Sequence, residues 1–347
     1  MYSSPIATGR RKLKSRILLL IIASGVLFVF FLSLQISPRQ ASDNHRYDLV
    51  KVNPLLILDD FSSDPSKTWT LLKDAIWNGT AENMVLASTR VGDTGVIWLK
   101  KATIEPFTVE FFYYVGGGNG GNGFVFMFYK DSDYDPGAGR FLGFACRPDE
   151  KPCSKINAAG YGVEWDTLYN NSAYGVHDPS PSHIALIKDN VNHHLTYVND
   201  TTTKDNDWHR AKIIVKEDAL DVYVDKTLVL TWNGSFNRTY SQIGFGASSL
   251  VHYDWHIIDS FKIYGNTIKL NGLQQGWTVD LVDDKSEIVS SSIANDRGEA
   301  VIDVTSQNMP LNGYFKIHNE TGGIVFASQA ADELWGGDSL TLTRVPR

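Results

Sequence analysis

The residues that could do chemistry are gathered in one segment, Tyr161 to Ile187, which reads YGVEWDTLYNNSAYGVHDPSPSHIALI. Glu164 and Asp166 stand two apart in an apolar run typical of a strand, so their side chains lie on one face, roughly 7 Å apart. Two carboxylates placed in this way repel each other and need a cation or a proton to neutralise them. The spacing therefore predicts a cation-binding site.

Three further polar residues follow the two carboxylates: Asn170, then Asp178 before a proline, then His183. Carboxylate, amide and carbonyl oxygens are hard ligands that suit calcium. An imidazole adds a second site that suits manganese or zinc. The alternative is a solvated strand edge whose Asp-Pro pair opens a loop and whose histidine is incidental. The ordered set Glu-x-Asp-x-x-x-Asn, Asp-Pro and a histidine five residues after that Asp disfavours this alternative.

The stretch VEWDTLYN…DPSPSHI is similar to the paired-metal motif of the legume-type (L-type) lectins, whose fold is a concanavalin-like jelly-roll β-sandwich. The resemblance extends from about residue 58 to residue 264, and it includes an early LDDF and a late IGFGAS (243–248). It implies a calcium-dependent carbohydrate-binding protein that is not an enzyme.

The resemblance also implies two metal ions and their ligands. The ligands of a transition metal, Mn²⁺ or another such ion, would be Glu164, Asp166, Asp178 and His183. The ligands of Ca²⁺ would be Asp166, the carbonyl of Leu168, Asn170 and Asp178. Asp166 and Asp178 would then bridge both ions.

The carbohydrate-binding residues implied by the resemblance are Asn122, Phe141, Leu142, Gly143 and Asn170. The amide NH₂ of Asn170 and the backbone of the loop GAGRFLG (137–143) would meet sugar oxygens. Two positions depart from the family pattern. Asn122 replaces a carboxylate that normally accepts two sugar hydroxyl bonds, and an amide accepts more weakly. Leu168 stands where an aromatic side chain usually provides the stacking platform, although Tyr169 is adjacent.

Two other functions are compatible with the same β-sandwich fold. A laminarinase-like glycoside hydrolase needs two carboxylates, about 5.5 Å apart for retention. Its second catalytic Glu should follow shortly after Asp166, where Tyr169 and Asn170 stand instead, which disfavours hydrolysis. A vestigial lectin-fold module for adhesion or structure, without sugar binding, is the other alternative, motivated by Asn122 and Leu168.

The elements that must position these residues are short apolar-alternating runs separated by Gly, Asn, Asp and Pro. Such alternation predicts strands with one buried face, and the repeated turn signals predict a sandwich. The predicted strands of the larger domain include FTVEFFYYV (107–115), GFVFMFY (123–129), HIALI (183–187), AKIIV (211–215) and LDVYV (220–224). Those of a small C-terminal β-sandwich are WTVDLVD (277–283), EAVIDV (299–304), YFKIHN (314–319) and GIVFAS (323–328). The predicted fold class is all-β, preceded by one transmembrane helix.

The expected organisation has five parts: a cytoplasmic basic tail (1–16), a transmembrane signal anchor (17–36), a linker (37–54), the lectin-like domain (55–264) and the small accessory β-sandwich (265–347). Residues 17–36 contain no charged side chain, and twenty helical residues span about 30 Å, the thickness of the hydrocarbon core. The basic residues before them should stay cytoplasmic, so the bulk of this single-pass protein would be extracellular or luminal. A cleaved signal peptide is the alternative, but its apolar core would be unusually long.

The net charge of −7 argues against a nucleic-acid partner, because such proteins carry basic stripes. The expected partners are a glycan and the membrane, and a homo-oligomer remains open. Cys146 and Cys153 could form a disulfide in an oxidising compartment or stay two free thiols.

Two other features are expected to carry no chemistry. The pairs His193-His194 and His252-x-x-x-His256 lack a carboxylate partner nearby in sequence, which favours surface or packing roles over metal binding. The glycine-dense stretch GGGNGGNG (116–123) lies between strands rather than before a helix. A flexible hairpin tip is therefore expected there, rather than a phosphate cradle.

Overall fold

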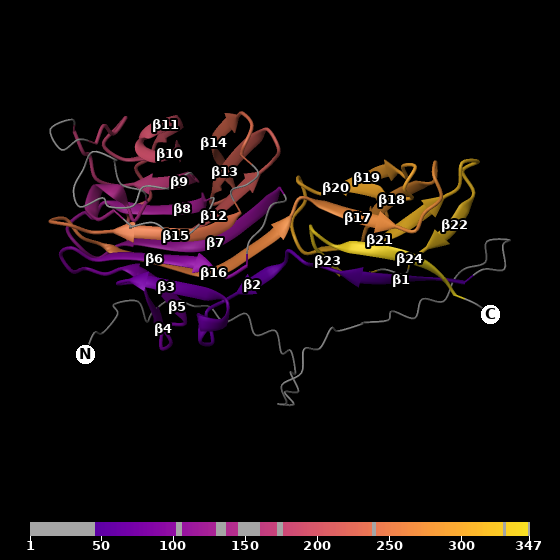
Figure 1. Cartoon of the computed structure of the whole chain (residues 1–347), viewed down its shortest axis with the longest axis horizontal. Coiled ribbons are helices and arrows are strands. Elements are labelled where there is room, and N and C mark those ends of the chain that lie inside the picture. Colours follow the sequence, from indigo (N-terminus) through magenta and orange to yellow (C-terminus); the bar gives the residue numbers. More distant parts are fainter. Residues whose placement is uncertain are drawn as a thin grey trace. The chain divides into compact units, whose positions relative to one another are not determined.

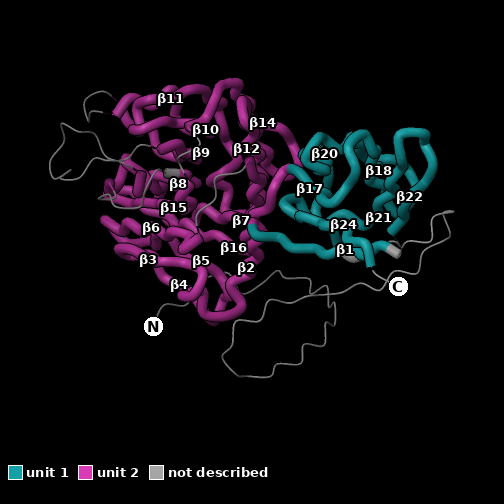
Figure 2. The backbone as a smooth tube through the Cα atoms, turned by 45° about the vertical axis from the view of Figure 1, so that its right-hand side comes forward, with its two compact units in different colours: residues 1–54, 267–347 teal, residues 55–266 magenta. Residues whose placement is uncertain are grey.

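A computed structural model of the chain describes residues 46–101, 106–129, 137–144, 160–171, 176–237, 241–328 and 331–345. The elements in this part of the chain are strands and two short 3₁₀ helices, η1 (Pro65–Lys67) and η2 (Gly139–Phe141), which confirms the all-β prediction (Figure 1). The chain forms two compact units, shown in Figure 2. Among the described residues, the larger unit comprises residues 55–266, and the smaller unit combines residues 46–54 with residues 267–345.

The larger unit contains two antiparallel sheets. The order of the seven-stranded sheet is β11 (Asn190–Asn199), β10 (His183–Lys188), β9 (Gly160–Asp166), β8 (Gly123–Tyr129), β15 (Gln242–Ser248), β6 (Thr94–Leu99) and β3 (Trp69–Lys73). The order of the eight-stranded sheet is β14 (Thr227–Asn233), β13 (Ala219–Val224), β12 (Trp208–Val215), β7 (Phe107–Gly116), β16 (Trp255–Gly265), β5 (Asn83–Ala87) and β4 (Ile76–Asn78), with β2 (Ile57–Asp59) paired to β16. All five strands that the sequence predicts for this domain are present.

An aromatic core lies between the two sheets. Trp165 on β9 stacks on Phe124 of β8 at 4.8 Å, and it meets Phe111 of β7 edge-on at 5.9 Å. Phe111 in turn contacts Phe245 at 4.8 Å. Burying one such large side chain contributes about 1.5–3 kcal/mol. Because alternate residues of β9 are held in this core, Glu164 and Asp166 must face the other side of the sheet.

The outer face of the seven-stranded sheet is also covered. A second apolar cluster packs Phe141, Leu142 and Phe144 from the segment around η2, together with Val176, against side chains of β6, β8, β10 and β11. The polar residues on this outer face are therefore shielded from water, although they lie outside the sandwich core.

The smaller unit contains two further sheets. The four-stranded sheet has the order β1 (Arg46–Val52), β24 (Ser339–Val345), β17 (Thr267–Asn271) and β20 (Ala300–Asp303). The five-stranded sheet has the order β19 (Ile288–Ile293), β18 (Thr278–Asp283), β21 (Leu311–His318) and β22 (Ile324–Ala327), with β23 (Ala331–Leu334) paired to β21.

The expectation of a linker over residues 37–54 is wrong for residues 46–52. These residues form β1, which pairs with β24 along its whole length and buries Leu49. Pairing with a strand almost 300 residues away cannot be predicted from local composition. The polar residues of this segment are also typical of a linker, which is why the sequence predicted one. The larger unit is thus inserted between β1 and β17 of the smaller one.

The expectation of a hairpin tip at residues 116–123 is also wrong, because β7 and β8 belong to different sheets. The backbone N–H groups of Gly118 and Gly121 donate to the Asp254 carboxylate at 2.9 and 2.7 Å. A Cβ atom at Gly118 would lie 1.9 Å from the Tyr253 carbonyl oxygen, so the close approach requires glycine. The glycines allow the chain to pass close to Tyr253 and Asp254 as it crosses from one sheet to the other.

Several expected features lie outside the described residues. These are the basic tail (1–16), the anchor (17–36), residues 37–45, and both Cys146 and Cys153. Within the described ranges, we find no helix long and apolar enough to cross a membrane.

Candidate metal and ligand site

Two neighbouring strands bring the predicted ligands together. β9 and β10 pair antiparallel, which places His183 opposite Asp166 and Ala185 opposite Glu164. Directly opposed residues share a face of the sheet. Glu164, Asp166 and His183 therefore lie together on the outer face, and each is at least 97% buried.

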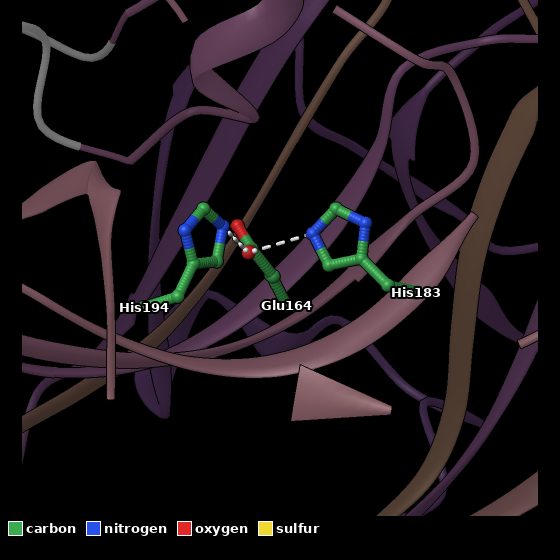
Figure 3. Close-up of side chains that lie close together, drawn as sticks. All are labelled: Glu164, His183 and His194. Carbon is green, nitrogen blue, oxygen red and sulfur yellow. Dashed lines mark hydrogen bonds and ion pairs between the residues drawn. The ribbon is translucent and has the colours of Figure 1, made fainter. Parts of the chain in front are cut away.

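Glu164 is held by two imidazoles, as Figure 3 shows. Its Oε1 atom lies 3.2 Å from Nε2 of His183 and 3.0 Å from Nε2 of His194. Burial alone would raise the pKa of Glu164, but the hydrogen bonds from His183 and His194 outweigh burial and lower this pKa below its ordinary value. Glu164 is therefore an anion with two imidazole partners.

Asp166 and Asp178 lack such partners. Neither carboxylate has an ion-pair partner among the described residues. Burial, followed by the charges of Asp178 and Glu164, raises the pKa of Asp166 well above its ordinary value. Burial also raises the pKa of Asp178. In both cases burial, with the charges of the other carboxylates, outweighs the groups that lower the pKa.

The loop after β9 is ordered around these two acids. The Asp166 carboxylate accepts the N–H of Leu168 at 2.9 Å, and the Asp178 carboxylate accepts the N–H of Asn170. The side-chain NH₂ of Asn170 donates to the Leu168 carbonyl at 2.8 Å, so this amide and this carbonyl meet. Hydrogen bonds thus link Asp166, Leu168, Asn170 and Asp178, the four residues expected to hold calcium.

A lysine from a distant segment supports the same loop. Lys204 donates to the carbonyl of Thr167 at 2.9 Å, and its charge acts to lower the pKa of Asp166. Lys204 is not among the site residues expected from the sequence. It lies 37 residues from Thr167 in the chain, and nothing in the local sequence signals the contact.

The residues expected to bind sugar fall into two groups. Asn122 lies at the site, where its backbone carbonyl accepts the N–H of Thr167 at 3.0 Å. It is 2% exposed, and its side-chain NH₂ has no acceptor in the described ranges. An unpaired buried donor costs about 1–3 kcal/mol. A ligand oxygen at this position would remove that cost.

In contrast to the Asn122 side chain, the backbone donors of the loop around η2 already have hydrogen-bond acceptors. The N–H groups of Phe141, Leu142 and Gly143 donate to the carbonyls of Ala138, Gly139 and Gly137, at 3.4, 2.9 and 2.9 Å. Phe141 and Leu142 are buried in the outer apolar cluster. In this structure the backbone donors expected to meet a sugar are engaged within the loop itself.

His194 is the site residue that sequence reasoning missed. The pairing of β10 with β11 is regular from His183 to Leu186, opposite Thr196, but at the next step Ile187 pairs with His194. This bulge leaves Leu195 to pack against the sandwich core, and it turns His194 to the outer face. The carboxylate partner that His194 lacks in the local sequence is Glu164, 30 residues earlier in the chain.

Comparison with known proteins gives likenesses to solved structures only. No protein-family model matches the chain, and no curated protein does. Peanut lectin in complex with a nine-residue peptide is 20% identical, with a TM-score of 0.49 over 61% of this chain and 96% of that one. The exoplasmic/lumenal domain of VIP36 in its Ca²⁺/Man3GlcNAc-bound form is 17% identical, with a TM-score of 0.47 over 60% of this chain and 90% of that one. Basic winged bean lectin with Tn-antigen is 15% identical, with a TM-score of 0.49 over 61% and 97%.

Proposed function

We propose that the larger unit binds carbohydrate in a calcium-dependent manner, and that an N-terminal membrane anchor displays it outside the cytoplasm. The observation that carries the proposal is a group of three carboxylates at the end of β9, in which Glu164 and Asp166 are buried and Asp178 is half-buried. Buried carboxylates of like charge are costly in free energy unless a cation neutralises them.

The oxygen donors of Asp166, Asp178 and the loop after β9 fit calcium. Asp166 and Asp178 offer carboxylates, Leu168 a backbone carbonyl and Asn170 a side-chain amide, all of which are ligands that Ca²⁺ accepts. When bound, Ca²⁺ supplies the positive charge that this group lacks. The four residues already contact one another, so little ordering of the chain opposes binding.

Two further groups fit contact with a sugar. Among the described residues, Asn122 holds a buried, unpaired amide NH₂, and Tyr169, in the loop after β9, is 53% exposed. An amide donor can bond a sugar hydroxyl, and a tyrosine ring supplies an apolar face with a polar tip. Asn170, which bonds Asp178 and the Leu168 carbonyl, would hold the loop that carries Tyr169.

The decisive experiment separates metal from sugar. Full-length protein is titrated with Ca²⁺ by calorimetry and then screened on a glycan array with and without EDTA. Asp166→Ala and Asp178→Ala are expected to lose both activities. Asn122→Ala is expected to keep the calcium heat and lose the glycan signal, because Asn122 is not among the proposed calcium ligands. A chain that binds glycans equally well in EDTA contradicts the proposal.

Two other outcomes of that experiment favour the alternatives. Calcium binding without any glycan signal would identify a vestigial lectin-fold module for adhesion or structure. Sugar release from glucans would identify a laminarinase-like hydrolase, in which Glu164 would have to act as a catalytic carboxylate. The two imidazoles on Glu164 argue against that role, because they keep its carboxylate ionised and occupied.

Membrane anchoring rests on the sequence of residues 1–36. The apolar run 17–36 and the basic cluster before it support a single-pass protein with a cytoplasmic N-terminus. Alkaline carbonate extraction should leave the protein in the membrane pellet, and protease added outside should digest residues 46–347. Release into the soluble fraction, with a new N-terminus after residue 36, would instead identify a cleaved signal peptide.

A further inference from the structure

His194 adds a third donor atom to Glu164 and His183, and this donor is not among the ligands that the motif implies. The two Nε2 atoms lie 3.2 and 3.0 Å from the same oxygen of Glu164, and the three donor atoms all fall within 4.8 Å of one another (Figure 3). Neighbouring donors in a tetrahedral zinc site are about 3.4 Å apart. The three side chains therefore surround a point that one such ion can reach with small side-chain shifts.

The fold holds these three donors in place. They come from three adjacent strands, β9, β10 and β11, and the β11 bulge brings His194 onto the face of Glu164. Glu164 and His183 are almost fully buried, whereas the His194 side chain is 11% exposed. Packing thus fixes two donors, and the third lies where an ion can enter.

The donor types differ between the loop after β9 and the three strands β9, β10 and β11. On the loop side, Asp166, Leu168, Asn170 and Asp178 offer only oxygen, which suits calcium. On the strand side, two imidazoles accompany one carboxylate. Imidazole favours zinc and its neighbours over the harder manganese, and a set of two histidines and one glutamate is a known zinc combination.

We propose that Glu164, His183 and His194 form a zinc(II) site, with calcium held separately by the oxygen donors of the loop. The proposal refines the proposed function and rests on it only for the calcium ion on the other side of the cluster. It differs from the ligand set implied by the motif because a second imidazole takes part.

The test uses full-length protein, freed of metal with EDTA and then saturated with Ca²⁺. The protein is titrated with Zn²⁺ by calorimetry and with Co²⁺ by visible absorption. We expect one Zn²⁺ per chain, and a Co²⁺ form with the intense visible bands of a four-coordinate ion. His194→Ala should weaken Zn²⁺ binding by more than about 100-fold, beyond the 10- to 100-fold typical of losing an outer-shell partner. The cobalt bands should be lost with it.

His193→Ala is the matched control, because it removes the exposed neighbouring imidazole and should bind Zn²⁺ like the parent. His194→Gln is a second variant in case the alanine variant does not fold. Its amide can still donate to Glu164 but is a poor zinc ligand, so the same loss is expected. Unchanged zinc affinity in either His194 variant, or an equal loss in His193→Ala, overturns the zinc site.

Calcium titration of the same variants separates this inference from the proposed function. His194→Ala that keeps its calcium heat and its zinc affinity would overturn only the zinc site. A parent protein that binds Zn²⁺ but gives no calcium heat would overturn the proposed function and leave the zinc site standing.

Discussion

The larger unit contains two clusters of imidazole and carboxylate with opposite character. In the first, His183 and His194 meet Glu164 beside Asp166 and Asp178. Glu164, Asp166 and His183 are buried, and His194 and Asp178 are half-buried. In the second, His209 is clamped between Asp225 at 2.7 Å and Asp205 at 3.0 Å. The side chain of Asp225 is 54% exposed and that of Asp205 is 43% exposed. The residue types are nearly the same, and burial is what differs.

The difference in burial explains why a bound metal ion is expected at the first cluster and not at the second. Around His209, water screens the excess carboxylate, and an exposed ion pair is worth at most about 1 kcal/mol. Around Asp166, burial and neighbouring charge raise the pKa, because the carboxylates have lost hydration without gaining a cation. A bound cation is therefore expected to matter greatly at the first cluster and little at the second.

The largest expected effect is stabilisation by calcium. At a free concentration of about 100 times Kd, a ligand that binds only the folded state adds about 2.7 kcal/mol, or roughly 5–10 °C in Tm for a unit of this size. Asp166→Asn should abolish this increase, because a calcium ligand loses its charge. Asp225→Asn at the second cluster is the control and should retain the full increase. Thermal melts with Ca²⁺ and with EDTA measure both, and a calcium-dependent shift that survives in Asp166→Asn would remove Asp166 from the site.

A smaller effect is expected from Lys204, which supports the loop without being a metal ligand. Losing its hydrogen bond to the Thr167 carbonyl removes about 0.5–1.5 kcal/mol, so Lys204→Ala should weaken calcium binding about threefold to tenfold. Lys67→Ala, an exposed lysine on η1, should leave the affinity unchanged. Calorimetry on the three proteins tests this prediction. Equal affinities in all of them would show that the loop keeps its shape without Lys204.

The smallest expected effect is a pH dependence at the second cluster. Burial acts to lower the pKa of His209, but its hydrogen bonds to Asp225 and Asp205 raise this pKa above the ordinary value. A raised pKa in the folded state means that the clamp contributes stability fully below about pH 6.5 and loses it as pH rises through the folded pKa. The contribution should stay under about 1 kcal/mol.

Urea unfolding of the parent and of His209→Gln at several pH values measures this contribution. The parent should be the more stable at pH 5.5, and the difference should shrink toward pH 8.5. A constant difference over this range would mean that the His209 ring acts by packing, for example against Tyr113 at 5.5 Å, rather than by charge.

Much of the fold and part of the site could be predicted from local sequence. Alternation in FTVEFFYYV and GYGVEWD identifies β7 and β9, and it puts Trp165 and Glu164 on opposite faces. The spacing of Glu164, Asp166, Asn170, Asp178 and His183 suffices to nominate a metal site, since side-chain direction in a strand is a property of the local backbone. These inferences need no knowledge of what the strand packs against.

Other features depend on segments far apart in the chain. By strict alternation, His193 would share a face with Tyr197 and Asn199, yet the β11 bulge puts His194 beside Glu164. Core packing of Leu195 accompanies that change of register, and no local pattern signals it. In the same way, residues 46–52 form a strand because they pair with β24, which lies at the other end of the chain.

The amino-acid sequence alone therefore determined that this chain makes β-strands, which residues of each regular strand face the core, and that carboxylates gather in one short segment. Backbone sterics and the two-residue period of a strand act over a few neighbours, so the sequence suffices for these. Tertiary structure alone decided that His194 reaches Glu164, that Asp166 and Asp178 have no ion-pair partner in the described part of the chain, and that residues 55–266 interrupt the chain of the smaller unit. Burial, register and strand pairing are set by contacts between distant residues, and these contacts exist only once the chain has folded.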